Sequence, residues 1–227
     1  KSNLKNDTLH SILFGNSNRN SEKVTEKFIQ KISFDKMKKM YDTVFNPIAD
    51  FNFFIVGDLE KNKLKAFLEK YIASIPNKGE KKKHINHHYK WLKKNNFKTI
   101  RIPLETTSSE IKIKHKNNLK YTQENILIAR ISSSILTIKL NEIIREKYGL
   151  SYGVSAAFSL FKEPENKVEL TISLETKSEN HPFILNIINQ EINSLKEGDF
   201  SKLLLTKVKT SVGKYFDDSM NYNHYSF

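Results

Sequence analysis

The sequence predicts an α+β fold, a two-layer domain in which a mostly antiparallel sheet is packed against helices. Short segments with alternating or continuous apolar residues, typical of strands, are separated by longer segments with apolar residues every three or four positions, typical of helices. The segments follow the order strand–helix, strand–strand–helix, strand–strand–helix–helix, which favours an antiparallel sheet with helices on one face. A hydrophobic fraction of 38%, with fifteen Phe and nine Tyr, can supply the core.

Residues 1–50 are predicted to be a helical opening segment, although residues 1–20 have weak periodicity. Ser21 and Ser33 can each cap a helix, because a serine hydroxyl accepts hydrogen bonds from the free N–H groups of the first turn. Asn46-Pro47 ends the second helix, since proline disfavours helix in the residue before it. The apolar residues of these two helices are Val24, Phe28 and Ile32, then Phe34, Met37, Tyr41, Val44 and Phe45.

Residues 51–76 are predicted to be a strand followed by a helix. Phe51–Gly57 is a short, mostly apolar run, which indicates a buried strand. Apolar residues at helical spacing follow from Leu64 to Ile72, and Pro76 ends the helix. Residues 77–96 are polar and basic without any period, and we expect a loop over the surface.

Residues 97–227 are predicted to contain the remaining strands and helices. Strands are expected at Phe97–Leu104 and Glu110–His115, followed by a helix from Glu124 to about Lys147 that is apolar on two faces and therefore deeply buried. Gly149 suits the left-handed position after this helix. An antiparallel pair of strands follows, at Tyr152–Phe161 and Lys167–Glu175. A helix is then expected from Pro182 to Gly198, and a final helix from Asp199 through Phe216. We assign residues 1–227 to a single domain.

The net charge of +13 is spread widely, with its densest cluster at Lys81–Lys83 in the basic loop. A solvated lysine surface explains such a pattern best. The absence of cysteine excludes disulfides, thiolate zinc sites and a cysteine nucleophile, but it does not fix the compartment. No apolar run approaches the roughly 18 residues needed to span a membrane.

Three histidines in the basic loop, His84, His87 and His88, have part of a zinc-motif pattern. His84 and His88 have the outer spacing of the inverted motif H-x-x-E-H, but His87 stands where the general-base Glu is required. The segment also lacks the apolar stripe of a buried helix, which a rigid zinc site needs. We therefore expect an exposed loop without a native zinc site. The sequence contains no G-x-S-x-G elbow and no Gly-rich phosphate loop, so the chain offers no complete catalytic site of its own.

Arg145 and Tyr152 form the most informative pattern, R-x-x-x-G-L-x-Y, at a helix-to-strand corner. Each has an ordinary explanation alone, because arginine complements a helix C-terminus and tyrosine is common in strands. Together with Gly149 and Leu150, however, they resemble a signature of the pitrilysin/insulinase family of zinc peptidases. The resemblance extends to Phe53–Asp58 with its helix, to the apolar helix before Arg145, to the strand pair after Tyr152 and to the tail Ser219–Phe227.

The resemblance implies the C-terminal, non-zinc-binding half of a zinc metalloendopeptidase, similar to large single-chain bacterial members. In that family Arg145 and Tyr152 would bind the peptide substrate, opposite a zinc ion held by the N-terminal half of the same protein. This part would hold no cofactor and would not hydrolyse peptides alone. The chain lacks an initiator Met and a signal-like start, and we expect it to be part of a longer protein, either periplasmic or cytoplasmic in a bacterium.

Two other classes stay open. Some members of the family have lost catalysis and act as scaffold subunits, and an intact H-x-x-E-H motif in the N-terminal half would distinguish the enzyme. A basic nucleic-acid-binding module would bind with an affinity that falls steeply with salt. Only Tyr89, Trp91 and Phe97 provide aromatic residues near the basic cluster, so we expect no nucleic-acid partner.

Overall fold

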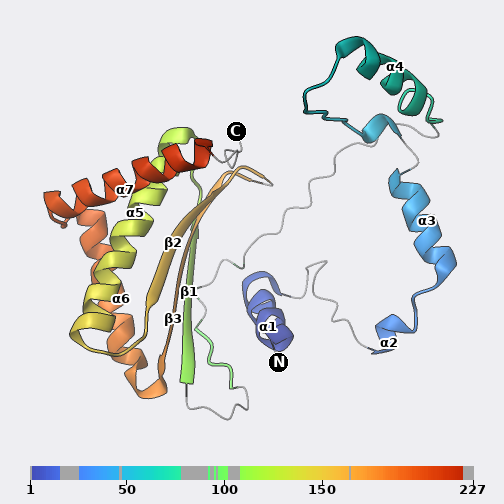
Figure 1. Ribbon diagram of the computed structural model, residues 1–227. Helices are drawn as coiled ribbons and strands as arrows, with labels where there is room; N and C mark the ends of the chain where they lie inside the picture. The colour runs from blue at the N-terminus through green and yellow to red at the C-terminus, as the bar shows by residue number, and fades with distance from the viewer. Residues whose placement is uncertain are drawn as a thin grey trace. The chain divides into compact units, whose positions relative to one another are not determined.

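The chain divides into two units, Lys1–Phe97 and Lys98–Phe227, coloured from blue to teal and from green to red in Figure 1. The computed structural model describes residues 2–15, 26–45, 48–77, 92, 95, 97–101, 108–163 and 165–221.

The regular secondary structure in the described parts of the N-terminal unit is helical. Helix α3 begins after Ser33, whose hydroxyl accepts a hydrogen bond from the Lys36 backbone N–H at 3.3 Å, so the predicted cap is confirmed. The helix expected before Pro76 is also present, whereas the first helix comes from a segment in which the sequence showed little periodicity. Ser21 lies outside the described residues. The helices are α1 (Ser2–Phe14), α2 (Glu26–Ile29), α3 (Phe34–Phe45), the 3-10 helix η3 (Ile48–Asp50) and α4 (Lys61–Tyr71).

The strand predicted at Phe51–Gly57 is wrong. The structure describes all seven residues, and none of them belongs to a strand. Their side chains are exposed, with 90% exposure for Phe54 and 98% for Val56. A strand forms only where a neighbour pairs with its backbone N–H and C=O groups, and no described residue of this unit forms such a neighbour. The described part of the strand predicted at Phe97–Leu104, residues 97–101, is likewise not a strand, and most of the basic loop 77–96 lies outside the described residues.

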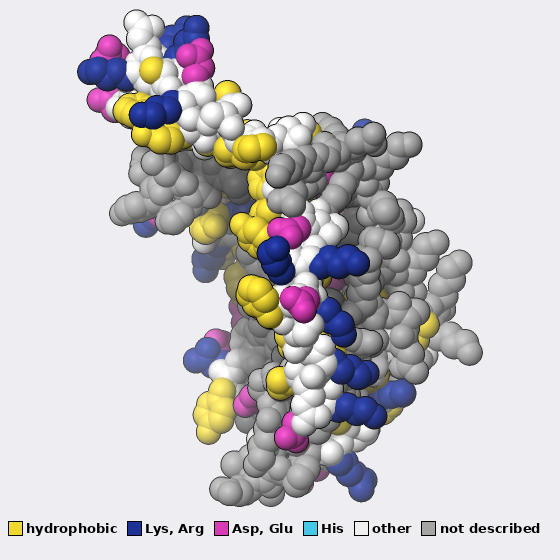
Figure 2. Space-filling view, turned by 90° about the vertical axis from the view of Figure 1, so that its right-hand side faces the viewer, with side chains coloured by type: hydrophobic (Ala, Val, Ile, Leu, Met, Phe, Trp, Pro, Cys, Tyr) yellow, Lys and Arg dark blue, Asp and Glu magenta, His cyan; other side chains and the backbone are white. Residues whose placement is uncertain are grey.

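Apolar residues of the N-terminal unit are exposed to an unusual degree. Helix α3 has hydrophobic residues on one side, including Phe34, Met37 and Met40, and all three are exposed. The rings of Tyr41 and Phe45 lie 4.7 Å apart on the same helix. In the space-filling view, hydrophobic side chains reach the surface next to lysine side chains, as at the top of the view where α4 lies (Figure 2). The hydrophobic pattern therefore specified these helices without specifying what covers them.

The C-terminal unit is built on an antiparallel sheet. Its described strands are β1 (Ser108–Asn117), β2 (Val154–Phe161) and β3 (Lys167–Lys177), in the order β1-β3-β2. Ile172 of β3 is paired with Ile113 of β1 on one side and with Ala156 of β2 on the other. This sheet and the helices beside it confirm the predicted α+β fold and the predicted antiparallel pair.

One face of the sheet carries the core. Leu170, Ile172 and Leu174 of β3 are buried, and the residues between them, Thr171 and Ser173, are less buried, as the two-residue period of a strand requires. Helices α5 (Gln123–Leu140) and α6 (His181–Glu197) lie on one side of the sheet in Figure 1. The result is the two-layer arrangement that the sequence predicted.

Helix α5 is buried on two sides, as its two apolar stripes predicted. Leu136 and Leu140 belong to the core beneath the sheet. Ile135, on another side of the helix, packs against Val208 and Val212 of α7 (Lys202–Asn221). The central helix therefore joins the sheet to α7.

An internal ion pair fixes α5 to α6. The Lys139 Nζ lies 2.8 Å from the Glu191 carboxylate, and it donates a hydrogen bond to the Ser194 hydroxyl at 2.6 Å. It also donates to the Asp199 carbonyl at 3.0 Å, just beyond the end of α6. Both members of the ion pair are largely buried, so these contacts satisfy charges that would otherwise be costly.

We predict that the two faces of β3 differ sharply in their contribution to stability. Ile172→Ala leaves a cavity in the core and should lower the free energy of unfolding by about 2–5 kcal/mol. Thr171→Ala, one residue away on the opposite face, should change it by less than about 1 kcal/mol. Urea unfolding of both variants tests this expectation. Equal losses would contradict the assignment of the core face.

Candidate functional site

The predicted pair lies at a corner between a helix end and a strand. Helix α5 continues into the π-helix η4 (Asn141–Lys147), which contains Arg145. The wider π-type turn is seen in the hydrogen bond from the Tyr148 N–H to the Ile143 carbonyl at 3.1 Å. Such single π-turns occur often at functional sites. The sequence predicted a helix to about Lys147, but not this change of helical type.

Gly149 closes the helix in a left-handed conformation, as predicted. Its φ is +62°, a backbone conformation that residues with a Cβ adopt only at a cost in free energy. The Gly149 N–H donates to the Arg145 carbonyl at 3.0 Å, and the Leu150 N–H donates to the Ile144 carbonyl at 2.9 Å. The backbone of Arg145 is therefore held by the closing turn itself.

Tyr152 lies at the tip of the corner, and hydrogen bonds hold the residues on both sides of it. The Ser151 hydroxyl donates to the Gly153 carbonyl at 2.9 Å and accepts from the Gly153 N–H at 3.2 Å. On the other side, the Leu150 carbonyl accepts a hydrogen bond from the Thr176 hydroxyl of β3 at 2.7 Å. Tyr152 itself is 99% exposed and precedes β2, which begins at Val154 rather than at the predicted Tyr152.

The Arg145 and Tyr152 side chains are both exposed. Within the part of the chain that the structure describes, neither side chain forms an ion pair or a hydrogen bond. Ile144, next to Arg145, is fully buried and anchors the π-turn in the core. The corner thus presents a guanidinium and a phenol O–H on a backbone that is internally fixed, and both groups can donate hydrogen bonds.

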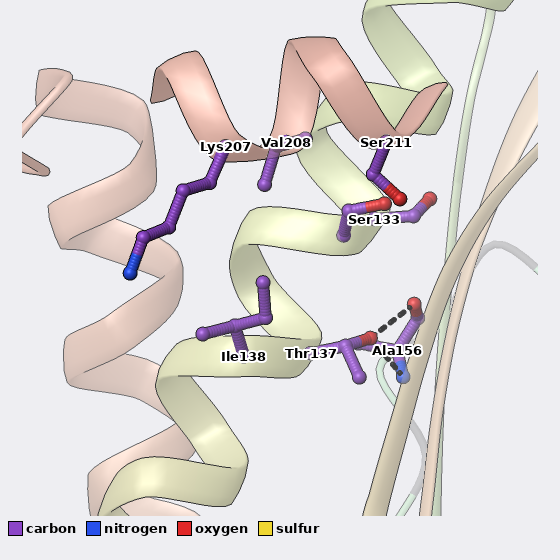
Figure 3. Close-up of a pocket in the computed structure, with 8 residues that line it drawn as sticks. Ser133, Thr137, Ile138, Ala156, Lys207, Val208 and Ser211 are labelled. Atoms are coloured by element: carbon purple, nitrogen blue, oxygen red, sulfur yellow. Dashed lines mark hydrogen bonds between the residues drawn. The ribbon is translucent and has the colours of Figure 1, made fainter. Parts of the chain in front are cut away.

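A cavity between α5, α7 and β2 is separate from this corner, with a volume of about 530 Å³ (Figure 3). Arg145 and Tyr152 do not line it. The Thr137 hydroxyl in its wall is already bonded to the Ala156 backbone, and Lys207 extends away from the hydroxyl groups. The cavity therefore offers few free polar groups to a ligand. Its lining residues are Ser133, Ser134, Thr137, Ile138, Ala156, Lys207, Val208 and Ser211.

The described residues contain no group of three or more His, Asp or Glu side chains that could hold a metal ion. His84, His87 and His88 lie outside the described residues, so the expected exposed loop stays a prediction. His115 is exposed on β1, and His181 begins α6. Among the helices that the structure describes, none is long and apolar enough to cross a membrane.

The chain belongs to the family described as the Peptidase M16 inactive domain, whose model matches residues 31–212. This match confirms the family resemblance drawn from the pattern around Arg145 and Tyr152. It also means that the family model extends over residues of both units.

Individual relatives are named as proteases. The chain is 27% identical over 202 residues to the probable zinc protease PqqL of Haemophilus influenzae, covering 85% of this chain and 21% of that protein. The ferredoxin protease FusC, solved in complex with Arabidopsis ferredoxin, matches with a TM-score of 0.77 and 14% identity, over 96% of this chain and 23% of FusC. The periplasmic protease PqqL of Escherichia coli matches with a TM-score of 0.75 and 14% identity, over 95% of this chain and 24% of that chain. The structural likeness establishes the fold, and the chain spans less than a quarter of the length of each of these proteins.

We predict that Gly149 and Gly213 respond to alanine in opposite directions. Gly149→Ala should lower the free energy of unfolding by about 1 kcal/mol, because alanine is strained at positive φ. Gly213, inside α7, has open space around its missing Cβ, and Gly213→Ala should stabilise by about 0.5–1 kcal/mol. Thermal unfolding of the two variants distinguishes the positions, and a stabilising Gly149→Ala would contradict the left-handed turn.

We also predict that the untagged chain, dialysed after exposure to zinc, retains no stoichiometric metal. The reason is the His87 in place of the motif Glu, and the lack of a further ligand set in the described residues. Elemental analysis of the chain and of a His84→Ala/His88→Ala variant should give the same low zinc content. One zinc per chain that disappears in the variant would show a native site in the basic loop.

Proposed function

We propose that this chain is the substrate-gripping, non-zinc-binding C-terminal part of a zinc metalloendopeptidase. Its peptide substrate would be held opposite a zinc site in the N-terminal half of the same protein. The family membership, the relative named as a zinc protease and the two protease structures with the same fold support this proposal. We further propose that residues 1–227 act as one functional domain, since the family model crosses the boundary between the units.

The observation that carries the proposal is the pair of exposed donors on an anchored backbone. The guanidinium of Arg145 is always charged, and the phenol of Tyr152 donates through its O–H. A peptide carbonyl has only acceptor capacity, so it is a suitable partner for both. When such a carbonyl is attacked, negative charge develops on its oxygen, and donors already in position stabilise that charge without further reorganisation.

The zinc ion belongs, in this proposal, to the N-terminal half. The donor set of the described residues does not fit a zinc site. The role of this chain is to bind and orient the peptide. The net charge of +13 would favour peptides with acidic residues, because opposite charge raises the rate and specificity of encounter.

A scaffold subunit without catalysis is the second candidate, because the family description itself calls this domain inactive. The two candidates differ in what Arg145 and Tyr152 do. A scaffold needs neither donor, whereas a substrate-gripping domain loses activity without them. Experiments on the full-length protein therefore separate the two candidates.

We predict that Arg145→Leu and Tyr152→Phe each lower the rate of peptide hydrolysis by the full-length protein by roughly 10²–10³-fold, as for the loss of one oxyanion-hole donor. Tyr152→Phe keeps the ring and removes only the O–H, and Arg145→Leu removes the guanidinium while keeping an aliphatic side chain. Zinc content and melting temperature should stay near those of the unmodified protein, because both side chains are exposed and form no internal hydrogen bond in the described structure.

Matched controls are available on the same helix and just before it. Arg130→Leu removes an arginine that stacks on Tyr215 of α7, and Tyr121→Phe removes an exposed phenol. Both should keep activity within about threefold, because a surface substitution away from the substrate changes little. Full activity of Arg145→Leu and Tyr152→Phe, or equal losses in the controls, would reject the substrate-gripping role.

A further inference from the structure

We infer that Asn141 is a positioning residue that sets the separation of Arg145 and Tyr152. The inference rests on the proposed function, because it concerns how the two substrate donors are held. It adds a residue that the R-x-x-x-G-L-x-Y pattern does not contain.

The Asn141 carboxamide makes three hydrogen bonds. The Asn141 Nδ2 donates to the Val154 carbonyl at 2.7 Å, and the Asn141 Oδ1 accepts from the Val154 N–H at 3.0 Å. The Nδ2 also donates to the Thr137 carbonyl at 2.8 Å, one turn back along the helix. The side chain is therefore fixed at both ends, on its own helix and on the facing strand.

The position of these bonds connects both arms of the corner. Asn141 is the first residue of the π-helix, four residues before Arg145. Val154 is the first residue of β2, two residues after Tyr152. A carboxamide that holds Val154 against the start of the π-helix therefore fixes the distance between the two segments that carry the donors. The carboxamide supplies both the acceptor and the donor that the two backbone groups of Val154 require, and its second amide hydrogen is available for the Thr137 carbonyl.

Two neighbouring side chains make the same kind of contact without reaching the corner. The Thr137 hydroxyl donates to the Ala156 carbonyl at 2.9 Å and accepts from the Ala156 N–H at 3.1 Å. The Ser133 hydroxyl accepts from the Phe158 N–H at 2.8 Å. These bonds hold β2 progressively farther from Tyr152. Thr137 is consequently a matched control, since it also bonds to both backbone groups of one β2 residue.

The first experiment compares Asn141→Ala with Thr137→Val in the full-length protein. Both should lower the melting temperature by similar amounts, because each removes contacts between α5 and β2. Asn141→Ala should in addition lower kcat by roughly 10–100-fold, since a small misplacement of positioned groups is costly in rate. Thr137→Val should keep kcat within about threefold. Equal kcat values for the two variants would reject the inference.

The second experiment tests whether Asn141 acts through the pair. In a background that already carries Arg145→Leu and Tyr152→Phe, Asn141→Ala should lower kcat by less than about threefold, because residues that act together are not additive. The same 10–100-fold loss in both backgrounds would show a general structural role and overturn the inference. Hydrolysis that is unaffected by Arg145→Leu and Tyr152→Phe would instead reject the proposed function itself.

Asn141→Asp serves as a second variant, in case the alanine variant does not fold. It keeps the oxygen that accepts from the Val154 N–H, but it places a carboxylate oxygen against the carbonyls of Val154 and Thr137. We expect a folded protein with kcat lowered by at least about tenfold, by the same misplacement argument. Unchanged kcat in a folded Asn141→Asp protein would contradict the positioning role.

Discussion

The row of polar side chains along α5 and the first residue of η4 is the constraint on which the C-terminal unit depends. Ser133, Thr137 and Asn141 recur every four residues, and they hydrogen-bond to Phe158, Ala156 and Val154, which recur every two residues along β2. Four helical residues advance about 6 Å and two strand residues about 6.8 Å, so the helix can follow the strand over three contacts. The helix thus occupies the place of a further strand and satisfies both backbone groups of Val154 and Ala156 and the N–H of Phe158.

This arrangement has consequences for packing. An unpaired strand edge is a site for unwanted association, and covering it with a helix removes that risk. The same helix buries Leu136 and Leu140 in the core beneath the sheet and Ile135 against α7. Because α5 covers the edge of β2, buries side chains in the core and packs against α7, its register along β2 is strongly constrained. The register of the helix therefore also positions the corner at its end, which carries Arg145 and Tyr152.

In our proposal the domain contributes to a peptidase by binding the substrate, without chemistry of its own. Its described residues supply donors and anchored backbone, not metal ligands. In our proposal the free energy for holding the corner comes from the fold, through the closing turn at Gly149, the Thr176–Leu150 hydrogen bond and the Asn141 contacts. Exposed donors then need little reorganisation when a peptide binds, which is the physical basis of preorganised binding.

The sequence by itself determined the α+β class, the two-faced helix α5, the pairing of β2 with β3 and the left-handed Gly149, because each depends on local periodicity or on one residue's backbone preference. It also singled out Arg145 and Tyr152, whose shared role stays a prediction. It misassigned Phe51–Gly57, since an apolar run says that a segment should be covered but not that a partner strand is present. Tertiary structure alone decided the π-turn and the hydrogen bonds of Asn141, because both depend on the strand that the helix meets, and no periodicity in α5 records which backbone groups lie opposite.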